Sequence, residues 1–332
     1  MSAGAAINVV GGGAWGTALA NAAAAAGHPV TLWLRDPEAA ARLQAERENP
    51  RYLPGVPLHP GIRATAESEG LAGARATLLV VPAQTVRGVL EALRAPLASA
   101  GPVILCAKGI ERGSDSFMSA VAGEVLLPDT PVAVLSGPSF AADVARGLPT
   151  AVTLAAADAG RAASLSALLS GPSLRLYHTD DVRGVEIGGA GKNVLAIACG
   201  IVAGRGLGES ARAALIARAF AELMRFARTF GGRPETLMGL SGLGDLVLTA
   251  SSPQSRNFAF GQRLGTGASP GEAAGGKLAE GAFTAAALAG LAAAQGVEMP
   301  VAQAVAAIVA GAAGVDDVVA GLLARPLRGE TD

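Results

Sequence analysis

The most constraining feature of this chain is a glycine-rich turn near its N-terminus, set between an expected strand and an expected helix. Residues 11–16 read GGGAWG and fit the pattern G-x-G-x-x-G. Residues 6–10 are typical of a buried strand, and residues 14–26 of a helix that ends at Gly27. A bare match means little among 45 glycines, but the strand–turn–helix setting is the one that a dinucleotide-binding loop requires. The sequence therefore predicts an N-terminal unit that binds a dinucleotide.

Each glycine of this pattern has a physical task. Gly11 permits the tight turn, Gly13 lets the backbone approach the pyrophosphate, and Gly16 lets the helix pack closely on the strand. The helix then begins with amide groups and the positive end of its dipole directed at the bound anion.

The end of the second expected strand, residues 30–34, bears on the choice of cofactor. A carboxylate there binds the adenine-ribose hydroxyl of NAD, whereas an arginine accommodates the 2′-phosphate of NADP. This chain has Arg35 followed by Asp36. Arg35 is the better placed for a 2′-phosphate, and Asp36 keeps NAD open, so we expect NAD or NADP.

The first half of the chain alternates between strand and helix signals. Further strands are expected at residues 77–81, 103–106, 132–135, 151–154 and 174–177, helices at 83–97 and 114–127, and a surface loop at 46–60. Beyond Asp180 the signals are almost all helical, with glycine-rich breaks. We therefore predict a Rossmann-type, mostly parallel, doubly wound α/β domain over residues 1–182 and an all-α domain over residues 183–332.

Composition narrows the class of partner. A length of 332 residues suits two domains. With 4% aromatic residues, a net charge of −1 and no basic tract, we expect no nucleic-acid partner. The apolar stretch 299–315 is rich in alanine and interrupted by Pro300 and Gly311, which favours a core helix over membrane insertion.

Other features point to a reducing compartment and no metal. Cys106 and Cys199 lie in apolar surroundings without metal-type spacing, as expected of buried free thiols. The short apolar start lacks a basic leader, so we expect no signal peptide and a cytoplasmic location. No histidine, carboxylate or cysteine cluster suggests a metal site.

Polar residues in the second half are candidates for chemistry. Lys192 and Asn193 interrupt an apolar, small-residue helix, and burying a lysine without purpose is costly. A lysine whose side chain reaches to the surface is the open alternative. Asp245 and Thr249 are spaced one helical turn apart and can share a helix face.

Six ordered motifs carry a resemblance over nearly the whole chain. They are GGGAWGTALA at 11–20, AKGIE at 107–111, LSGPSFA at 135–141, GAGKNVLAIA at 189–198, LSGLGDL at 240–246 and SRN at 255–257. With them the chain resembles the bacterial type of NAD(P)-dependent glycerol-3-phosphate dehydrogenase. The resemblance implies a 6-phosphogluconate-dehydrogenase-like fold, a small phosphorylated substrate, and a homodimer. The implied reaction interconverts dihydroxyacetone phosphate and sn-glycerol 3-phosphate, which supplies the phospholipid backbone.

The resemblance also implies site residues. Lys192 matches the family's catalytic lysine, with Asp245 and Lys108 beside it in the reaction. A lysine can give and take a proton when burial and a neighbouring cation bring its pKa down from about 10.4. The implied substrate-binding residues are Lys108, Gly137, Ser139, Lys192, Asn193, Asp245, Thr249, Ser255, Arg256 and Asn257. The implied cofactor-binding residues are Gly11, Gly13, Ala14, Trp15, Gly16, Arg35, Lys108, Ala141, Arg256, Leu278 and Glu280.

Two places depart from the family's pattern. Gly191 stands before the lysine where a larger residue is usual, which we expect to loosen local packing. Residues 203–210 lack the usual aspartate–glycine start and carry an unexpected Arg205.

Two other functions remain as alternatives. A β-hydroxyacid dehydrogenase also uses a lysine, but its substrate bears a carboxylate, whereas Lys108 and residues 255–257 favour phosphate. A nucleotide-sensing protein would keep the glycine loop but would not need Lys108, Lys192 and Asp245 together.

Overall fold

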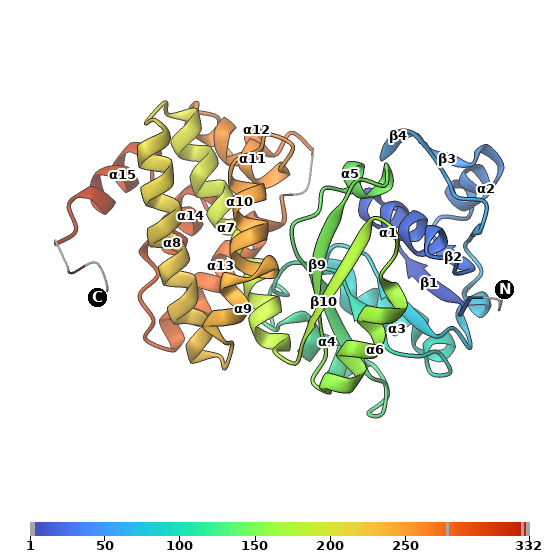
Figure 1. Cartoon of the computed structure of the whole chain (residues 1–332). Helices are drawn as coiled ribbons and strands as arrows, with labels where there is room; N and C mark the ends of the chain where they lie inside the picture. The colour runs from blue at the N-terminus through green and yellow to red at the C-terminus, as the bar shows by residue number, and fades with distance from the viewer. Residues whose placement is uncertain (1–3, 277–278, 327–328, 330–332) are drawn as a thin grey trace. The chain divides into compact units, whose positions relative to one another are not determined.

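The computed structural model describes residues 4–276, 279–326 and 329 (Figure 1). By its internal contacts the chain divides into two compact units. Unit 1 comprises the chain up to Gly189 together with Gly231–Asp245, and unit 2 comprises Ala190–Phe230 and the chain from Leu246 onward. Unit 1 therefore includes Gly231–Asp245, a segment from the helical half of the sequence. The order of residues along the chain did not indicate this division. The functional boundary after residue 182 stays a prediction.

Unit 1 is built on a sheet that, within the described residues, has eight strands in the order β10-β9-β8-β7-β6-β1-β2-β5. Its strands are β1 Ile7–Val10, β2 Val30–Trp33, β5 Ile62–Thr65, β6 Ala76–Leu79, β7 Val103–Leu105, β8 Val132–Ser136, β9 Thr150–Ala155 and β10 Leu174–Thr179. Only β8 and β9 pair antiparallel among these neighbours. β1 pairs with both β2 and β6, so the strand order reverses there, and the predicted doubly wound sheet is confirmed.

Helices cover both faces of this sheet. The helices of unit 1 are α1 Ala14–Ala25, α2 Pro37–Glu46, α3 Val86–Leu97, α4 Met118–Val125, α5 Ala141–Ala145, α6 Ala159–Leu169 and α9 Pro234–Met238, with short turns η1 Ser68–Leu71, η2 Ala83–Thr85 and η3 Leu240–Gly244. One apolar core lies between the sheet and α1, α5 and α6. A second lies between the sheet and α3 and α4.

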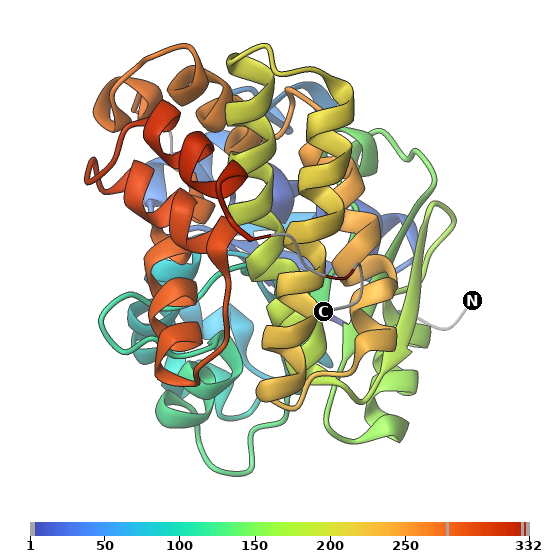
Figure 2. The same cartoon turned by 90° about the vertical axis from the view of Figure 1, so that its left-hand side faces the viewer.

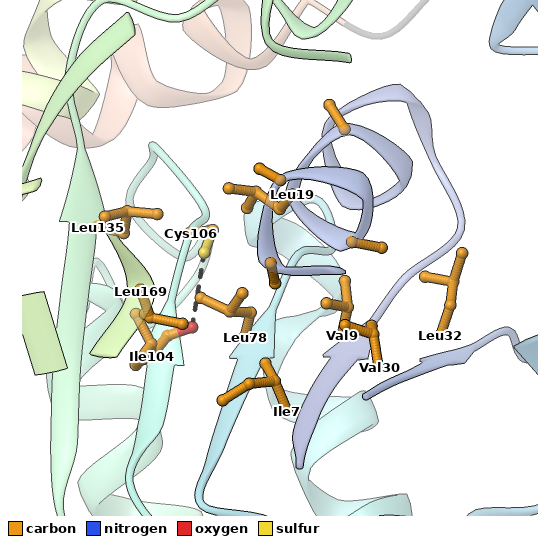
Figure 3. Close-up of a cluster of buried hydrophobic side chains, with 14 of the residues drawn as sticks. Ile7, Val9, Leu19, Val30, Leu32, Leu78, Ile104, Cys106, Leu135 and Leu169 are labelled. Atoms are coloured by element: carbon orange, nitrogen blue, oxygen red, sulfur yellow. Dashed lines mark hydrogen bonds between the residues drawn. The ribbon is translucent and has the colours of Figure 1, made fainter. Parts of the chain in front are cut away.

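Strand alternation divides the side chains between these two cores. Figure 3 shows Ile7, Val9 and Leu78 in the first core, together with Leu19 of α1. Val10 lies in the second core, because successive strand side chains point to opposite faces. The inner strands β1, β6 and β7 are therefore buried on both faces, which explains their continuous apolar runs. The outer strand β10 instead alternates between buried and exposed residues over most of its length.

Two expectations for the first half were wrong. The surface loop expected at residues 46–60 contains an antiparallel pair, β3 Glu48–Asn49 with β4 Leu53–Pro57. Its prolines hid the strand signal, since proline cannot donate to a ladder. The helix expected from residue 114 begins only at Met118, because Asp115 has a φ of +52°, which a right-handed helix does not accommodate.

Unit 2 is helical, as predicted for this part of the chain. Its helices are α7 Val182–Gly204, which begins in unit 1, α8 Glu209–Thr229, α10 Asp245–Ala250, whose first residue belongs to unit 1, α11 Arg256–Gly265, α12 Pro270–Ala274, α13 Glu280–Ala294, α14 Pro300–Val309 and α15 Val315–Leu323. α7 and α8 run side by side (Figure 2), and Leu223 of α8 packs at Gly191 of α7. The expected core helix near residue 300 is α14, whose Val301, Val305 and Ile308 are buried.

Small residues bring α7 and α11 into backbone contact. A Cβ added at Gly200 would lie 2.1 Å from the Phe258 carbonyl oxygen, and one at Gly261 would lie 2.0 Å from that of Ile197. Only glycine fits at these two positions. α7 is long and apolar enough to cross a membrane by composition, but 89% of its most apolar window is buried inside the protein. Its hydropathy is therefore that of a core helix.

Candidate functional site

The glycine loop between β1 and α1 has the geometry that its pattern predicts. Gly11 has a φ of +119°, and a Cβ there would lie 2.2 Å from the Val80 carbonyl oxygen. A Cβ at Gly16 would lie 1.8 Å from the Gly11 carbonyl oxygen, so α1 packs directly on the loop. Gly13 differs from both, since a Cβ there would meet no heavy atom within 4 Å. The loop is therefore closed on its protein side and open at Gly13, which fits a diphosphate lying against its backbone.

The first turn of α1 is suited to an anion. Gly13 is its N-cap, no side chain caps the turn, and the first turn holds no acidic residue. Ala14 and Trp15, at the start of the helix, are both half-buried. The uncapped amides and the helix dipole together provide the electrostatics that a dinucleotide diphosphate requires.

Asp36 has a structural task at the end of β2. Its Oδ1 accepts a hydrogen bond from the Glu38 backbone N–H at 3.0 Å and so caps α2. Arg35 beside it is exposed. The Asp36 carboxylate thus serves the helix through one of its two oxygens, and the exposed Arg35 guanidinium beside it can also reach a ligand.

Lys108 lies where β7 ends and makes two strong polar contacts within unit 1. Its Nζ lies 2.7 Å from Asp245 Oδ2 and donates to the Gly137 carbonyl oxygen at 2.9 Å. The Asp245 side chain is only 2% exposed and that of Lys108 15%. A buried pair of this kind is sensitive to loss of either partner, because the remaining charge would be left in an apolar setting.

The fold explains why these residues meet. β7 and β8 are parallel neighbours, so Lys108 and Gly137, which follow them, lie at the same edge of the sheet. Gly137 has a φ of +145°, and a Cβ there would lie 2.9 Å from Val152 Cα, so the turn requires glycine. Ser139 Oγ donates to the Gly137 carbonyl oxygen at 3.0 Å. Ala141 follows as the first residue of α5.

Asp245 is presented by an irregular turn. It opens α10 directly after η3, a π-helical turn. Gly242 makes that turn possible, since a Cβ there would lie 2.0 Å from the Leu237 carbonyl oxygen. Single π-helical turns are frequent at functional sites, and this one carries the LSGLGD motif.

Lys192 is buried in α7 and does not reach to the surface. Its exposed fraction is 7%, and its Nζ donates to Thr249 Oγ1 at 2.8 Å. Thr249, in α10, is 3% exposed. The lysine that interrupts this apolar helix is therefore held in a defined position inside unit 2.

Asn193 and Asn257 join three helices of unit 2. Asn257 Nδ2 donates to Asn193 Oδ1 at 2.8 Å, and Asn257 Oδ1 accepts from the Gly281 backbone N–H at 3.0 Å. Both side chains are buried. Their amides thus link α7, α11 and α13.

The SRN motif forms the start of α11. Ser255 is its N-cap and accepts a hydrogen bond from the Phe258 N–H at 3.2 Å. Arg256, the first helical residue, is exposed. Glu280 is half-buried at the start of α13, and Leu278, which the resemblance assigned to the cofactor, lies outside the described residues.

Several polar residues escaped the sequence analysis. The hydroxyls of Ser136 and Ser241 are buried and have no hydrogen-bond partner within the part of the chain that the structure describes. Ser136 is the first residue of the SGPS motif, and that position could have marked it as a candidate site residue. The Glu111 carboxylate accepts hydrogen bonds from Nε and Nη2 of Arg87, at 3.0 and 2.8 Å. These hydrogen bonds lower the pKa of the Glu111 carboxyl and stabilise the segment after Lys108.

The two departures from the family's pattern have structural explanations. Gly191 does not loosen the packing, because Leu223 fills the space: an added Cβ would lie 2.4 Å from its Cδ1. Arg205 forms an ion pair with Asp316 of α15.

The cysteines are free and buried, and burial raises the pKa of each thiol to about 12. Thiols with such a pKa are poor nucleophiles at neutral pH. Across residues 4–276, 279–326 and 329, no group of three or more His, Cys, Asp or Glu side chains could hold a metal ion.

Comparisons with known proteins agree with this geometry. Family models for the N-terminus and the C-terminus of NAD-dependent glycerol-3-phosphate dehydrogenase match residues 6–162 and 181–320. A glycerol-3-phosphate dehydrogenase [NAD(P)+] of Methylobacterium radiotolerans is 90% identical over the full length of both chains. Its counterpart in Azorhizobium caulinodans is 60% identical over 99% of this chain and 100% of its own. The crystal structure of glycerol-3-phosphate dehydrogenase from Coxiella burnetii, at 39% identity, gives a TM-score of 0.91 over 97% of this chain and 99% of that one.

Proposed function

This chain belongs to the family of NAD-dependent glycerol-3-phosphate dehydrogenases, and we propose that Lys192 handles the proton in its reaction. The enzyme interconverts sn-glycerol 3-phosphate and dihydroxyacetone phosphate with NAD or NADP. The observation that carries the proposal is the burial of Lys192, at 7% exposed, with its Nζ held by Thr249. Burial of an ammonium group costs free energy, and a role in proton transfer would explain why this chain keeps a lysine there.

The proton balance follows from the reaction. When bound, the nicotinamide cofactor supplies or takes up the hydride. In reduction, Lys192 Nζ gives its proton to the carbonyl oxygen of the substrate, so that the alkoxide is neutralised as it forms. In oxidation, the neutral amine takes the proton of the alcohol. Thr249 Oγ1 orients the Nζ for both directions.

Lys108 and Asp245 are proposed as the second part of the catalytic machinery. Asp245 holds the Lys108 ammonium, which would provide positive charge for the substrate, with Gly137 and Ser139 beside it. Support comes from α10, which begins with Asp245 and carries Thr249 one turn later.

For the substrate phosphate we propose Arg256 as the main ligand. Its guanidinium is exposed at the N-terminal end of α11, where the helix dipole favours an anion. We propose Ser255, Asn193 and Asn257 as further substrate ligands. Ser255 also caps α11, and Asn257 also links α11 to α7 through Asn193.

The dinucleotide is proposed to lie on residues 1–182 and the substrate on residues 183–332. The glycine loop with Ala14 and Trp15 would bind the diphosphate. We propose that Arg35 favours NADP over NAD, because its exposed guanidinium closely follows β2, where the 2′-phosphate of NADP would lie. The remaining residues proposed on the cofactor side are Lys108, Ala141, Arg256, Leu278 and Glu280.

The cellular role is proposed as supply of glycerol 3-phosphate for phospholipid synthesis in the cytoplasm, without membrane insertion or nucleic-acid binding. A homodimer is proposed as the working form. Its support is α15, an apolar helix that has no buried residue and whose Leu323 is 82% exposed. Such a helix would be covered by a second copy.

The test is Lys192→Ala, assayed in both directions. We expect kcat to fall by about 10²- to 10⁴-fold, as for loss of a general acid–base, while the Kd for NADPH stays close to that of the parent. Added methylamine should restore part of the turnover, because it can occupy the space that the side chain leaves.

The matched control is Thr249→Val, which keeps the amine and removes its hydrogen-bond partner. It should lose less activity and should not respond to methylamine. Turnover of Lys192→Ala within threefold of the parent would exclude Lys192 from proton transfer. The parent should reduce dihydroxyacetone phosphate, but not dihydroxyacetone or a small keto acid. Its turnover with NADPH compared with its turnover with NADH tests the proposed preference for NADP.

A further inference from the structure

A segment outside the glycine pattern is fastened over α1 in unit 1. We call residues 48–59, which contain β3 and β4, the strap. Asn21 of α1 holds it: its Nδ2 donates to the Pro57 carbonyl oxygen and its Oδ1 accepts from the His59 N–H, both at 3.0 Å. Glu48 Oε1 accepts from the Gly55 N–H at 2.7 Å and closes the strap on itself.

One residue of the strap reaches the glycine loop. Asn49 is 6% exposed, and its Nδ2 donates to the Gly12 carbonyl oxygen at 2.9 Å and to Thr17 Oγ1 at 2.8 Å. Thr17 lies in α1 and is fully buried. Both amide hydrogens of Asn49 are thus used, one on the loop and one on the helix that follows it.

The contact with Gly12 controls a peptide plane. In a trans peptide the C=O and the next N–H point in opposite directions, so holding the Gly12 oxygen turns the Gly13 N–H away from Asn49. Both residues of this peptide are glycines, and without Cβ atoms either orientation of the plane is sterically accessible. Gly13 is also the open position of the loop. The hydrogen bond from Asn49 therefore selects one of two peptide orientations at the point where a ligand can approach.

We propose that Asn49 is a positioning residue for the dinucleotide: it holds the Gly12–Gly13 peptide so that the Gly13 N–H binds the diphosphate. This inference rests on the proposed placement of the dinucleotide on the glycine loop. Asn49 touches no reacting atom in this role, and it acts through the affinity for NAD(P) rather than through the chemical step.

The variants Asn49→Ala and Asn49→Asp test the proposal. Asn49→Ala removes the donor, and we expect the Kd for NADPH to rise on the order of tenfold, as for loss of one or two hydrogen bonds. Asn49→Asp keeps the shape but cannot donate, and its charge faces the Gly12 carbonyl oxygen and the diphosphate. We expect on the order of a hundredfold weaker binding from it. For both variants, kcat at saturating NADPH and the KM for dihydroxyacetone phosphate should stay within twofold of the parent.

Asn21→Ala is the matched control, because it removes a tether of the strap that does not reach the glycine loop. Its Kd for NADPH should stay within twofold of the parent, measured by fluorescence titration. An unchanged Kd for NADPH in Asn49→Asp would overturn the proposal. A rise in the Kd for NADPH in Asn21→Ala as large as that in Asn49→Ala would also overturn it, because the effect would then belong to the strap as a whole. If the parent itself bound no NADPH, the placement of the dinucleotide would fail instead, so the two failures are distinguishable.

Discussion

Glu222 provides the most quantitative prediction, because it is an ionisable group in the interior of unit 2. It lies in α8, is 3% exposed, and both of its carboxylate oxygens accept from the Val301 N–H at 3.1 Å. The carboxylate thereby caps α14. Burial raises its pKa from 4.5 to about 7, although the backbone hydrogen bonds, Arg225 and Arg325 act in the opposite direction.

The sign of the pH dependence follows from this shift. The folded state holds the proton of Glu222 more tightly than the unfolded state, so its contribution to stability is fully present below pH 4.5 and is lost as the pH rises through about 7. Between about pH 5 and about pH 8 the loss amounts to about 2.5 kcal/mol. With an unfolding entropy of about 2.1 cal/mol/K per residue, this corresponds to about 4 °C in Tm for a chain of this length.

The perturbation is Glu222→Gln, which keeps the shape and one acceptor oxygen but does not titrate. The assay is thermal unfolding of parent and variant at the two pH values, since only the difference between them isolates this group. The Tm of the variant relative to the parent should rise by about 4 °C from the lower to the higher pH. Glu209→Gln, on the same helix but at an exposed position, is the control. Parallel Tm curves for Glu222→Gln and the parent would refute the reasoning, because they would mean that Glu222 has the same pKa in both states.

Two further predictions concern packing and substrate binding. Gly191→Ala should lower the free energy of unfolding by about 1–2 kcal/mol, because its Cβ would overlap the fully buried Leu223. Leu223→Ala removes that overlap, so it should lower the free energy of unfolding by at least about 1 kcal/mol less in the Gly191→Ala protein than in the parent. Chemical denaturation of the four proteins measures this coupling, and simple additivity would contradict the overlap. Arg256→Ala should raise the KM for dihydroxyacetone phosphate by about 10- to 100-fold, as for loss of a charge-assisted hydrogen-bonding pair, with a much smaller change in the Kd for NADPH. Steady-state kinetics measures the KM for dihydroxyacetone phosphate, and cofactor titration measures the Kd for NADPH. An equal rise in both would argue against a substrate-phosphate role for Arg256.

Motifs read from the sequence named the residues of the candidate site, but they did not give the contacts of those residues with the rest of the protein. Asn193 and Asn257 were both assigned to substrate, and the motif gave no sign that Asn257 also binds Asn193 and the backbone of α13. Asp36 was kept open as a ribose ligand, and the sequence did not show that its Oδ1 also caps α2. A motif identifies which residue type stands where, but an amide or carboxylate has many possible partners, and the choice depends on elements that are far away in the chain.

The glycine loop illustrates the division between local and tertiary information. Its strand, turn and helix follow from residues 6–26, because hydrophobic periodicity and the positive φ available to glycine act over a few neighbouring residues. The same local rules indicated that Lys192 lies in an apolar helix. Only the tertiary structure brought Asn49 to the Gly12 carbonyl oxygen, Leu223 to Gly191, and the returning segment with Asp245 to Lys108. These contacts join residues separated by between 32 and 137 positions, where no periodicity extends and where the packing of whole elements decides which side chains meet.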